Sequence, residues 1–154
     1  MRSITWRSGF TALEGLIVVA FFGLVMTLGA LSLNTARARA RDAVRLSDVS
    51  NIRAGLSLIW QQKATYPTNP GGDIGLPGLT DVLTLDGFVG GSQVKPPVLV
   101  QSVPGGPNSG EYYWYKGGPN GYSVRFSTER DTALGAANVY YLHSTGFDAS
   151  SDLT

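Results

Sequence analysis

The sequence predicts an α+β fold, in which the second half of a long N-terminal helix packs on a small C-terminal antiparallel sheet. Three observations lead to this prediction. They are an apolar run over residues 10–33, an amphipathic pattern over residues 34–65, and two aromatic-rich segments joined by a glycine-rich turn after residue 110. With 154 residues, the chain is long enough for one domain with one hydrophobic core.

The apolar run over residues 10–33 carries one charged side chain, Glu14. As a helix it would measure about 36 Å, enough to cross a bilayer once. We therefore expect a membrane-spanning helix preceded by a short polar segment, residues 1–9. A conventional secretory signal is a weaker interpretation, because its apolar region spans only about 7–15 residues. Arginines flank both ends of the run, so charge alone leaves the membrane orientation open.

Residues 34–65 continue the helix and give it one apolar face. Apolar side chains recur there at helical spacings of three and four residues, and no proline interrupts them. The stripe consists of Leu46, Val49, Ile52, Leu56 and Ile59. On the polar side, Asp42 with Arg45 and Arg45 with Asp48 are each three residues apart and can pair along the helix surface. We expect the stripe to face the sheet.

Residues 66–154 predict a loop-rich αβ region followed by the antiparallel sheet. Tyr66-Pro67 ends the helix, because a residue before proline avoids helical dihedrals. The sequence then predicts a loop to Leu79, a short helical or turn element over Leu79–Phe88 and a short strand over Val98–Val103.

The clearest strand signal lies in the C-terminal third. Glu111–Lys116 and Tyr122–Ser127 are aromatic-rich or alternate with period two, and the turn residues Gly117–Gly121 separate them, which is typical of a hairpin. Asn138–His143 is a third candidate strand. The tail after Gly146 is polar, and we expect it to be loose.

The charges are unevenly distributed along the chain. Residues 34–63 carry six basic and two acidic side chains, a net charge of +4, whereas residues 64–154 carry four basic and eight acidic ones, a net charge of −4. A basic stem and an acidic head suit contacts between neighbouring copies, although two solvated surfaces would show the same pattern. The negative head disfavours nucleic-acid binding.

The segment SGFTALEGLIVV, residues 8–19, resembles the class III leader of type IV pilins and type II secretion pseudopilins. In that family a membrane peptidase cuts after the glycine, the new N-terminal residue is methylated, and a glutamate stands fifth in the mature chain. The resemblance implies peptidase cleavage between Gly9 and Phe10 and N-methylation of Phe10. It also implies a role in filament assembly for Glu14, whose carboxylate would pair with the Phe10 amine of a neighbouring copy.

The resemblance implies a structural subunit of a type IV pilus-like surface filament, processed by prepilin peptidase and polymerised through its N-terminal helix. Its partners would be copies of itself, other pilins, the peptidase, and the pilus or secretion assembly machinery of the inner membrane. The precursor would cross that membrane once before joining an extracellular filament or a periplasmic pseudopilus. A pseudopilin of a type II secretion system is an alternative, and so is a simple membrane-anchored binding protein that does not polymerise.

The sequence departs from the family pattern in three places. Many pilins carry a proline midway along the span, but Met26–Leu33 has none, and Gly23 and Gly29 are the weak points of the helix instead. The residue after the glutamate is the small Gly15, where the family usually has a large apolar residue. The paired C-terminal cysteines of many pilins are missing, because the chain has no cysteine.

Other chemistry has little support in the sequence. The lack of cysteine excludes thiol catalysis and thiolate metal sites, and the single histidine, His143, excludes a His-rich site within one chain. His143 precedes Ser144, but neighbours on a strand point to opposite faces. We therefore expect no enzyme and no cofactor. Asp148 and Asp152 are too few ligands for calcium, so no metal is predicted.

The aromatic side chains of the predicted hairpin allow two interpretations. They could bind sugars or stack on bases, or one face of the hairpin could pack on Ile52, Leu56 and Ile59. The cluster consists of Tyr112, Tyr113, Trp114, Tyr115, Tyr122 and Phe126. Core packing is favoured, because aromatic strands with one buried face usually serve sheet packing.

Overall fold

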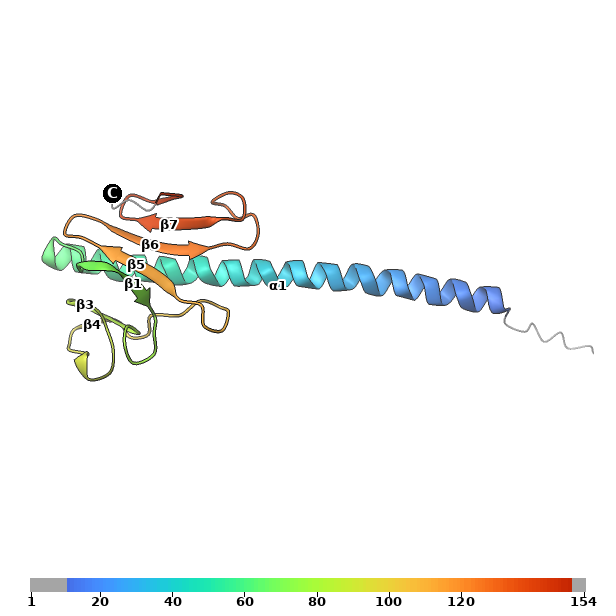
Figure 1. Cartoon of the computed structure of the whole chain (residues 1–154), viewed down its shortest axis with the longest axis horizontal. Helices are drawn as coiled ribbons and strands as arrows, with labels where there is room; N and C mark the ends of the chain where they lie inside the picture. Colours follow the sequence, from blue (N-terminus) through green and yellow to red (C-terminus); the bar gives the residue numbers. More distant parts are fainter. Residues whose placement is uncertain (1–10, 151–154) are drawn as a thin grey trace, which may run out of the picture. The chain divides into compact units, whose positions relative to one another are not determined.

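The structure, a computed structural model, describes residues 11–150. These residues fall into two compact units, one ending at Arg37 and the other beginning at Ala38. The predicted α+β class is confirmed: one long helix is followed by antiparallel strands (Figure 1). The second unit, called the head below, contains the C-terminal part of the helix and every strand.

Helix α1 spans Ala12–Lys63 and forms without a break. Thr11 caps its N-terminus, because its Oγ1 accepts a hydrogen bond from the backbone N–H of Glu14 at 3.3 Å. At the other end Ala64 takes a positive φ of 53°, while its N–H still donates to the carbonyl of Trp60 at 2.8 Å. The helix therefore ends at Lys63, three residues before Tyr66.

Two antiparallel sheets follow the helix. The five-stranded sheet has the order β1-β5-β6-β7-β8, and the three-stranded sheet has the order β3-β2-β4, with a 3₁₀ turn η1, Gly91–Gln93, between β3 and β4. The larger sheet consists of β1 (Asn69–Ile74), β5 (Tyr113–Gly117), β6 (Tyr122–Ser127), β7 (Val139–His143) and β8 (Phe147–Asp148). The smaller sheet consists of β2 (Val82–Thr84), β3 (Gly87–Val89) and β4 (Val98–Val100).

The head core lies between α1 and the sheets. The predicted stripe is confirmed: Val49, Ile52, Leu56 and Ile59 are all buried, and Leu46 packs at the margin. Gly55, on the same helix, lets the three-stranded sheet approach closely. A Cβ at that position would lie 2.6 Å from Leu83 Cδ2 and 2.8 Å from Val100 Cγ2. Figure 1 shows β1, β5, β6 and β7 beside the C-terminal part of the helix.

The predicted hairpin is confirmed as β5 and β6. These strands pair in continuous register, from Trp114 opposite Arg125 to Gly117 opposite Tyr122. Its inward aromatic side chains are buried in the core: Tyr113, Tyr115, Tyr122 and Phe126. The third candidate strand is confirmed as β7. The core-packing interpretation of the aromatic cluster therefore holds for these four side chains.

Three local predictions are wrong or incomplete. Leu79–Phe88 contains no helix: β2 and β3 pair there as a hairpin around Leu85-Asp86. The strand expected over Val98–Val103 stops at Val100. The segments expected to be a loop and a loose tail contain β1 and β8, the two edge strands of the larger sheet. β1 contains Pro70 and two glycines, which have low strand propensity, and β8 has only two residues, too few to show an alternating pattern. Both segments are strands because they pair with a neighbouring strand.

Candidate functional site: the apolar helix segment and the charged residues of α1

The first part of α1 exposes all its apolar side chains. No residue from Thr11 to Leu33 is buried, and side chains such as Leu16 and Met26 are more than 60% exposed. An 18-residue window of this helix has a mean hydropathy of 2.5. By length and composition, the segment is therefore able to cross a membrane.

Glu14 lies in the first turn of α1 and is exposed. Within residues 11–150, no side chain donates a hydrogen bond to its carboxylate or forms an ion pair with it. Acidic side chains suit this position, because the N-terminus of a helix carries partial positive charge. Gly9 and Phe10, the predicted cleavage and methylation positions, lie outside the described residues.

The glycines of the apolar segment leave space on the helix surface. A Cβ added at Gly23 or at Gly29 would meet no atom within 4 Å. The helix continues through both positions, and the hydroxyl of Thr27 donates to the Gly23 carbonyl at 2.8 Å. Small residues of this kind allow another helix to approach closely.

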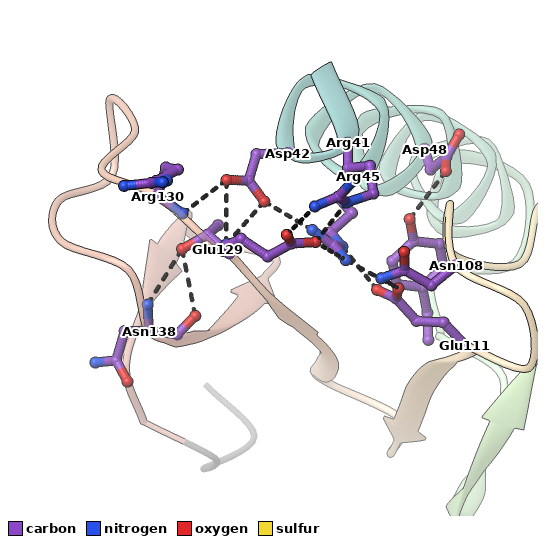
Figure 2. Close-up of polar contacts among 11 residues, drawn as sticks. Arg41, Asp42, Arg45, Asp48, Asn108, Glu111, Glu129, Arg130 and Asn138 are labelled. Carbon is purple, nitrogen blue, oxygen red and sulfur yellow. Dashed lines mark hydrogen bonds and ion pairs between the residues drawn. The ribbon is translucent and has the colours of Figure 1, made fainter. Parts of the chain in front are cut away.

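Arg45, on the part of α1 that lies in the head, is a buried cation that contacts carboxylates from three parts of the chain. Arg45 is 1% exposed. Its Nη1 donates to Asp42 Oδ1 at 2.7 Å, and its Nε donates to Glu111 Oε1 at 2.7 Å. Its Nη2 donates to Glu111 Oε2 and to Glu129 Oε1, each at 2.9 Å. Figure 2 shows these contacts. Arg41 also donates a hydrogen bond to Glu129. We call these five residues the Arg45 cluster: Arg41, Asp42, Arg45, Glu111 and Glu129.

Asp42 connects the helix to the loop after β6. Its carboxylate accepts hydrogen bonds from the backbone N–H groups of Glu129, at 2.9 and 3.1 Å, and Arg130, at 2.9 Å. The same carboxylate binds Arg45, which is buried against it. Glu111 precedes β5 and Glu129 follows β6, so both lie at the open end of the β5–β6 hairpin. The Arg45 cluster thus fastens α1 to that end of the hairpin.

These contacts shift the pKa of each carboxylate that faces Arg45 from the sheet side. The hydrogen bond from Arg41, with help from Arg45, lowers the pKa of Glu129 to about 2. The hydrogen bond from Arg45 lowers the pKa of Glu111, and the hydrogen bond to Glu111 raises the pKa of Arg45 above its ordinary value. The ionised forms of all three residues are therefore stabilised in the folded head.

One of the two predicted helix-surface ion pairs forms. Arg45 pairs with Asp42, as expected, but not with Asp48. The reason is that the guanidinium of Arg45 points to Glu111 and Glu129 and has its donors occupied there. Asp48 instead accepts a hydrogen bond from the hydroxyl of Tyr113 at 2.9 Å. Burial raises the pKa of Asp48, and this hydrogen bond opposes the shift.

His143 is buried at the end of β7, with acceptors at both ring nitrogens. Nδ1 lies 3.1 Å from the Tyr122 carbonyl oxygen, and Nε2 lies 3.0 Å from both Asp148 Oδ1 and the Ser150 carbonyl oxygen. These contacts hold the segment that contains β8 on the sheet. The ring thus has a structural role. Sequence reasoning missed this contact, because the tail carries no strand pattern.

Trp114, on the outer face of the larger sheet, is covered by its own chain. The guanidinium carbon of Arg125 lies 5.4 Å from the ring centroid, and Gly71 of the neighbouring strand lies close to the indole, where a side chain would clash. A ring with such neighbours offers little stacking surface to a sugar or base. In the described part of the chain, no three His, Cys, Asp or Glu side chains are grouped to hold a metal ion.

Comparison with models of protein families, with curated proteins and with solved structures finds no match to this chain.

Proposed function

We propose that this chain is the structural subunit of a type IV pilus-like filament, polymerised through the N-terminal part of α1. The observation that carries the proposal is the environment of Glu14. It is the one charged side chain in a segment whose apolar side chains are all exposed, and it lies in the first turn of the helix.

Lipid would cover the apolar segment while the chain stands alone in a membrane. In a filament, the same segments of several copies would cover one another. A carboxylate enclosed there needs a partner, because an unpaired charge away from water is costly. The Phe10 amine of a neighbouring copy, produced by cleavage after Gly9, is the candidate partner. An α-amine has an ordinary pKa near 8 and is mostly protonated at neutral pH.

The proposal assigns a separate task to each unit of the chain. The apolar unit would anchor the precursor and then form the filament interior. The head would form the outer surface, and its stability would come from its own core and from the Arg45 cluster. A pseudopilin of a secretion system would divide these tasks between the two units in the same way.

Processing is the first test. The mature protein is expected to begin at Phe10, because the peptidase would cut after Gly9. Intact mass and N-terminal sequencing of membrane-bound and surface-sheared protein measure this directly. A Gly9→Leu variant should remain as full-length precursor in the membrane. A wild-type surface protein that begins at Met1, or near Ala38, would contradict the proposal.

Polymerisation is the second test, and it separates the filament subunit from a simple membrane anchor. A filament subunit should pellet with sheared surface filaments, whereas an anchored binding protein would stay in the membrane fraction after the same treatment. Electron microscopy of the sheared material identifies the filament. A processed protein that never leaves the membrane fraction would favour the anchor.

A further inference from the structure

The charges of α1 that remain unpaired in the head suggest a contact between copies. Three basic side chains of the helix, Arg41, Arg45 and Lys63, form ion pairs within the chain. Within residues 11–150, no carboxylate forms an ion pair with Arg37, Arg39 or Arg53. Arg39 is exposed and lies at the beginning of the head. Part of the predicted excess of positive charge is thus left for an outside partner.

Asp48 forms no ion pair within residues 11–150 and lies at the edge of a groove. It is half-buried, and its one side-chain partner in the described structure is the Tyr113 hydroxyl. The groove has a volume of about 560 Å³ and runs between α1 and the segment that contains β4. Its walls include Leu58, Leu99 and Val100, and among the described residues that line it Asp48 is the one with a charged side chain.

The composition of the groove suits an arginine side chain. The three methylene groups of arginine prefer apolar surface, while its guanidinium needs a carboxylate or another acceptor. The apolar walls would take the methylene groups, and Asp48, with the neighbouring amides of Asn51 and Gln101, would take the guanidinium. Burial raises the pKa of Asp48, and a cation beside it would relieve that cost.

We propose that this groove receives Arg39 of a neighbouring copy of the chain, whose guanidinium pairs with Asp48. This contact rests on the proposed function, since a filament of identical subunits would bring helix α1 of one copy against the head of another. All copies inserted in one membrane point the same way, so the contact is between parallel helices. Arg39 precedes Asp48 by nine residues, so the contact requires an axial offset of about 14 Å between the two copies. The copy that supplies Arg39 is therefore a different neighbour from the one whose Phe10 amine would pair with Glu14, because that pair spans four residues, or about 6 Å.

A double-mutant cycle in filaments tests the pair. Arg39→Gln and Asp48→Asn each remove one charge, and the asparagine still offers an oxygen to the Tyr113 hydroxyl. Each single variant is expected to leave less than half of the wild-type fraction of subunits in pelletable filament after a salt wash. The double variant should lose no more than either single variant, because both changes remove one interaction. Lys116→Gln, on β5 of the other sheet, is the matched control and should behave like the wild type.

Chemical cross-linking tests the position of the contact. The chain has no cysteine, so Ala40→Cys with Asn51→Cys introduces the only two thiols. Within one helix these positions lie about 17 Å apart along the axis, beyond the reach of a short bismaleimide reagent. Between copies offset as proposed they lie close, so a cross-linked dimer is expected, with the 40–51 peptide identified by mass spectrometry. Ala40→Cys with Ser92→Cys, a residue exposed in η1, is the control and should not cross-link.

The outcomes separate this inference from the proposed function. Filaments with the 40–51 cross-link and a non-additive cycle support the contact. Filaments without that cross-link, or with additive losses, overturn it and leave the filament function standing. If the processed wild type makes no filament, the proposed function fails. A 40–51 cross-link in the membrane fraction would then still support a contact between copies, and its absence would overturn that as well.

Discussion

Two charged side chains on the same helix, Glu14 and Arg45, lie in opposite surroundings. Arg45 is buried and contacts three carboxylates, so the head balances that charge within one chain. Glu14 is exposed and has no side-chain partner in the described part of the chain, and the apolar side chains around it are exposed as well. The head is thus complete as a folded unit, whereas the apolar unit needs lipid or other chains to cover it.

The largest effect is expected at Glu14. Glu14→Val should be inserted and cleaved normally, because it makes the apolar segment more apolar, yet its filament yield should fall more than tenfold. The physical reason is that, in the proposed filament, the variant lacks the charge that would pair with the neighbour's amine and set the register between copies. Glu14→Gln, which keeps the shape and loses the charge, should be a partial rescue at best. The measurement is sheared filament per unit of mature membrane protein, and a wild-type yield from Glu14→Val would make the carboxylate a simple surface charge.

The second largest effect concerns the core of the head, studied in a soluble chain that begins at Asn34. Ile52 is completely buried, so Ile52→Asp would place a charge in the core and should destabilise the head by about 4 kcal/mol or more. Leu58→Asp is the matched control on the same helix, because Leu58 is 42% exposed, and its effect should stay below about 1 kcal/mol. Urea unfolding compares the two, and equal midpoints would show that the buried stripe does not hold the helix to the sheet.

The third prediction compares a buried with an exposed ion pair. Arg45→Met leaves Asp42 and its neighbouring carboxylates without their shared cation and should cost about 3 kcal/mol of stability. Lys63→Met removes the 2.8 Å contact to Asp86, whose side chain is 73% exposed, and should cost less than about 1 kcal/mol. The same unfolding measurement decides. Similar losses from the two variants would mean that solvent screens the Arg45 cluster far more than its burial suggests.

The smallest effect is the response of the Arg45 cluster to acid. Arg41 and Arg45 hold the pKa of Glu129 at about 2, below its value in the unfolded chain. A lowered carboxylate pKa contributes stability that is present above the unfolded pKa, near 4.5, and is lost as the pH falls toward 2. The melting temperature of the wild-type head should therefore drop across this window. Glu129→Gln should start lower at neutral pH and show a shallower drop, whereas parallel curves would count against the assigned ion pairs.

Much of the architecture could be predicted from local pattern. The buried positions from Val49 to Ile59 follow helical spacing, and the β5–β6 hairpin follows from its aromatic alternation and its turn residues. The edge strand β1 could not be predicted in this way, because Pro70, Gly71 and Gly72 carry no strand preference. Its strand conformation depends on pairing with β5.

The same division holds for the charges. The sequence alone identified Glu14 as the one charge in an apolar run, and it indicated that a basic stem precedes an acidic head. It predicted that both Asp42 and Asp48 can pair with Arg45, because both lie three residues away on the helix. The tertiary structure decided for Asp42, since Glu111 and Glu129 come from segments far along the chain and occupy the remaining donors of Arg45. A spacing within a helix is local, but the partner of a buried charge depends on segments that only the folded chain brings together.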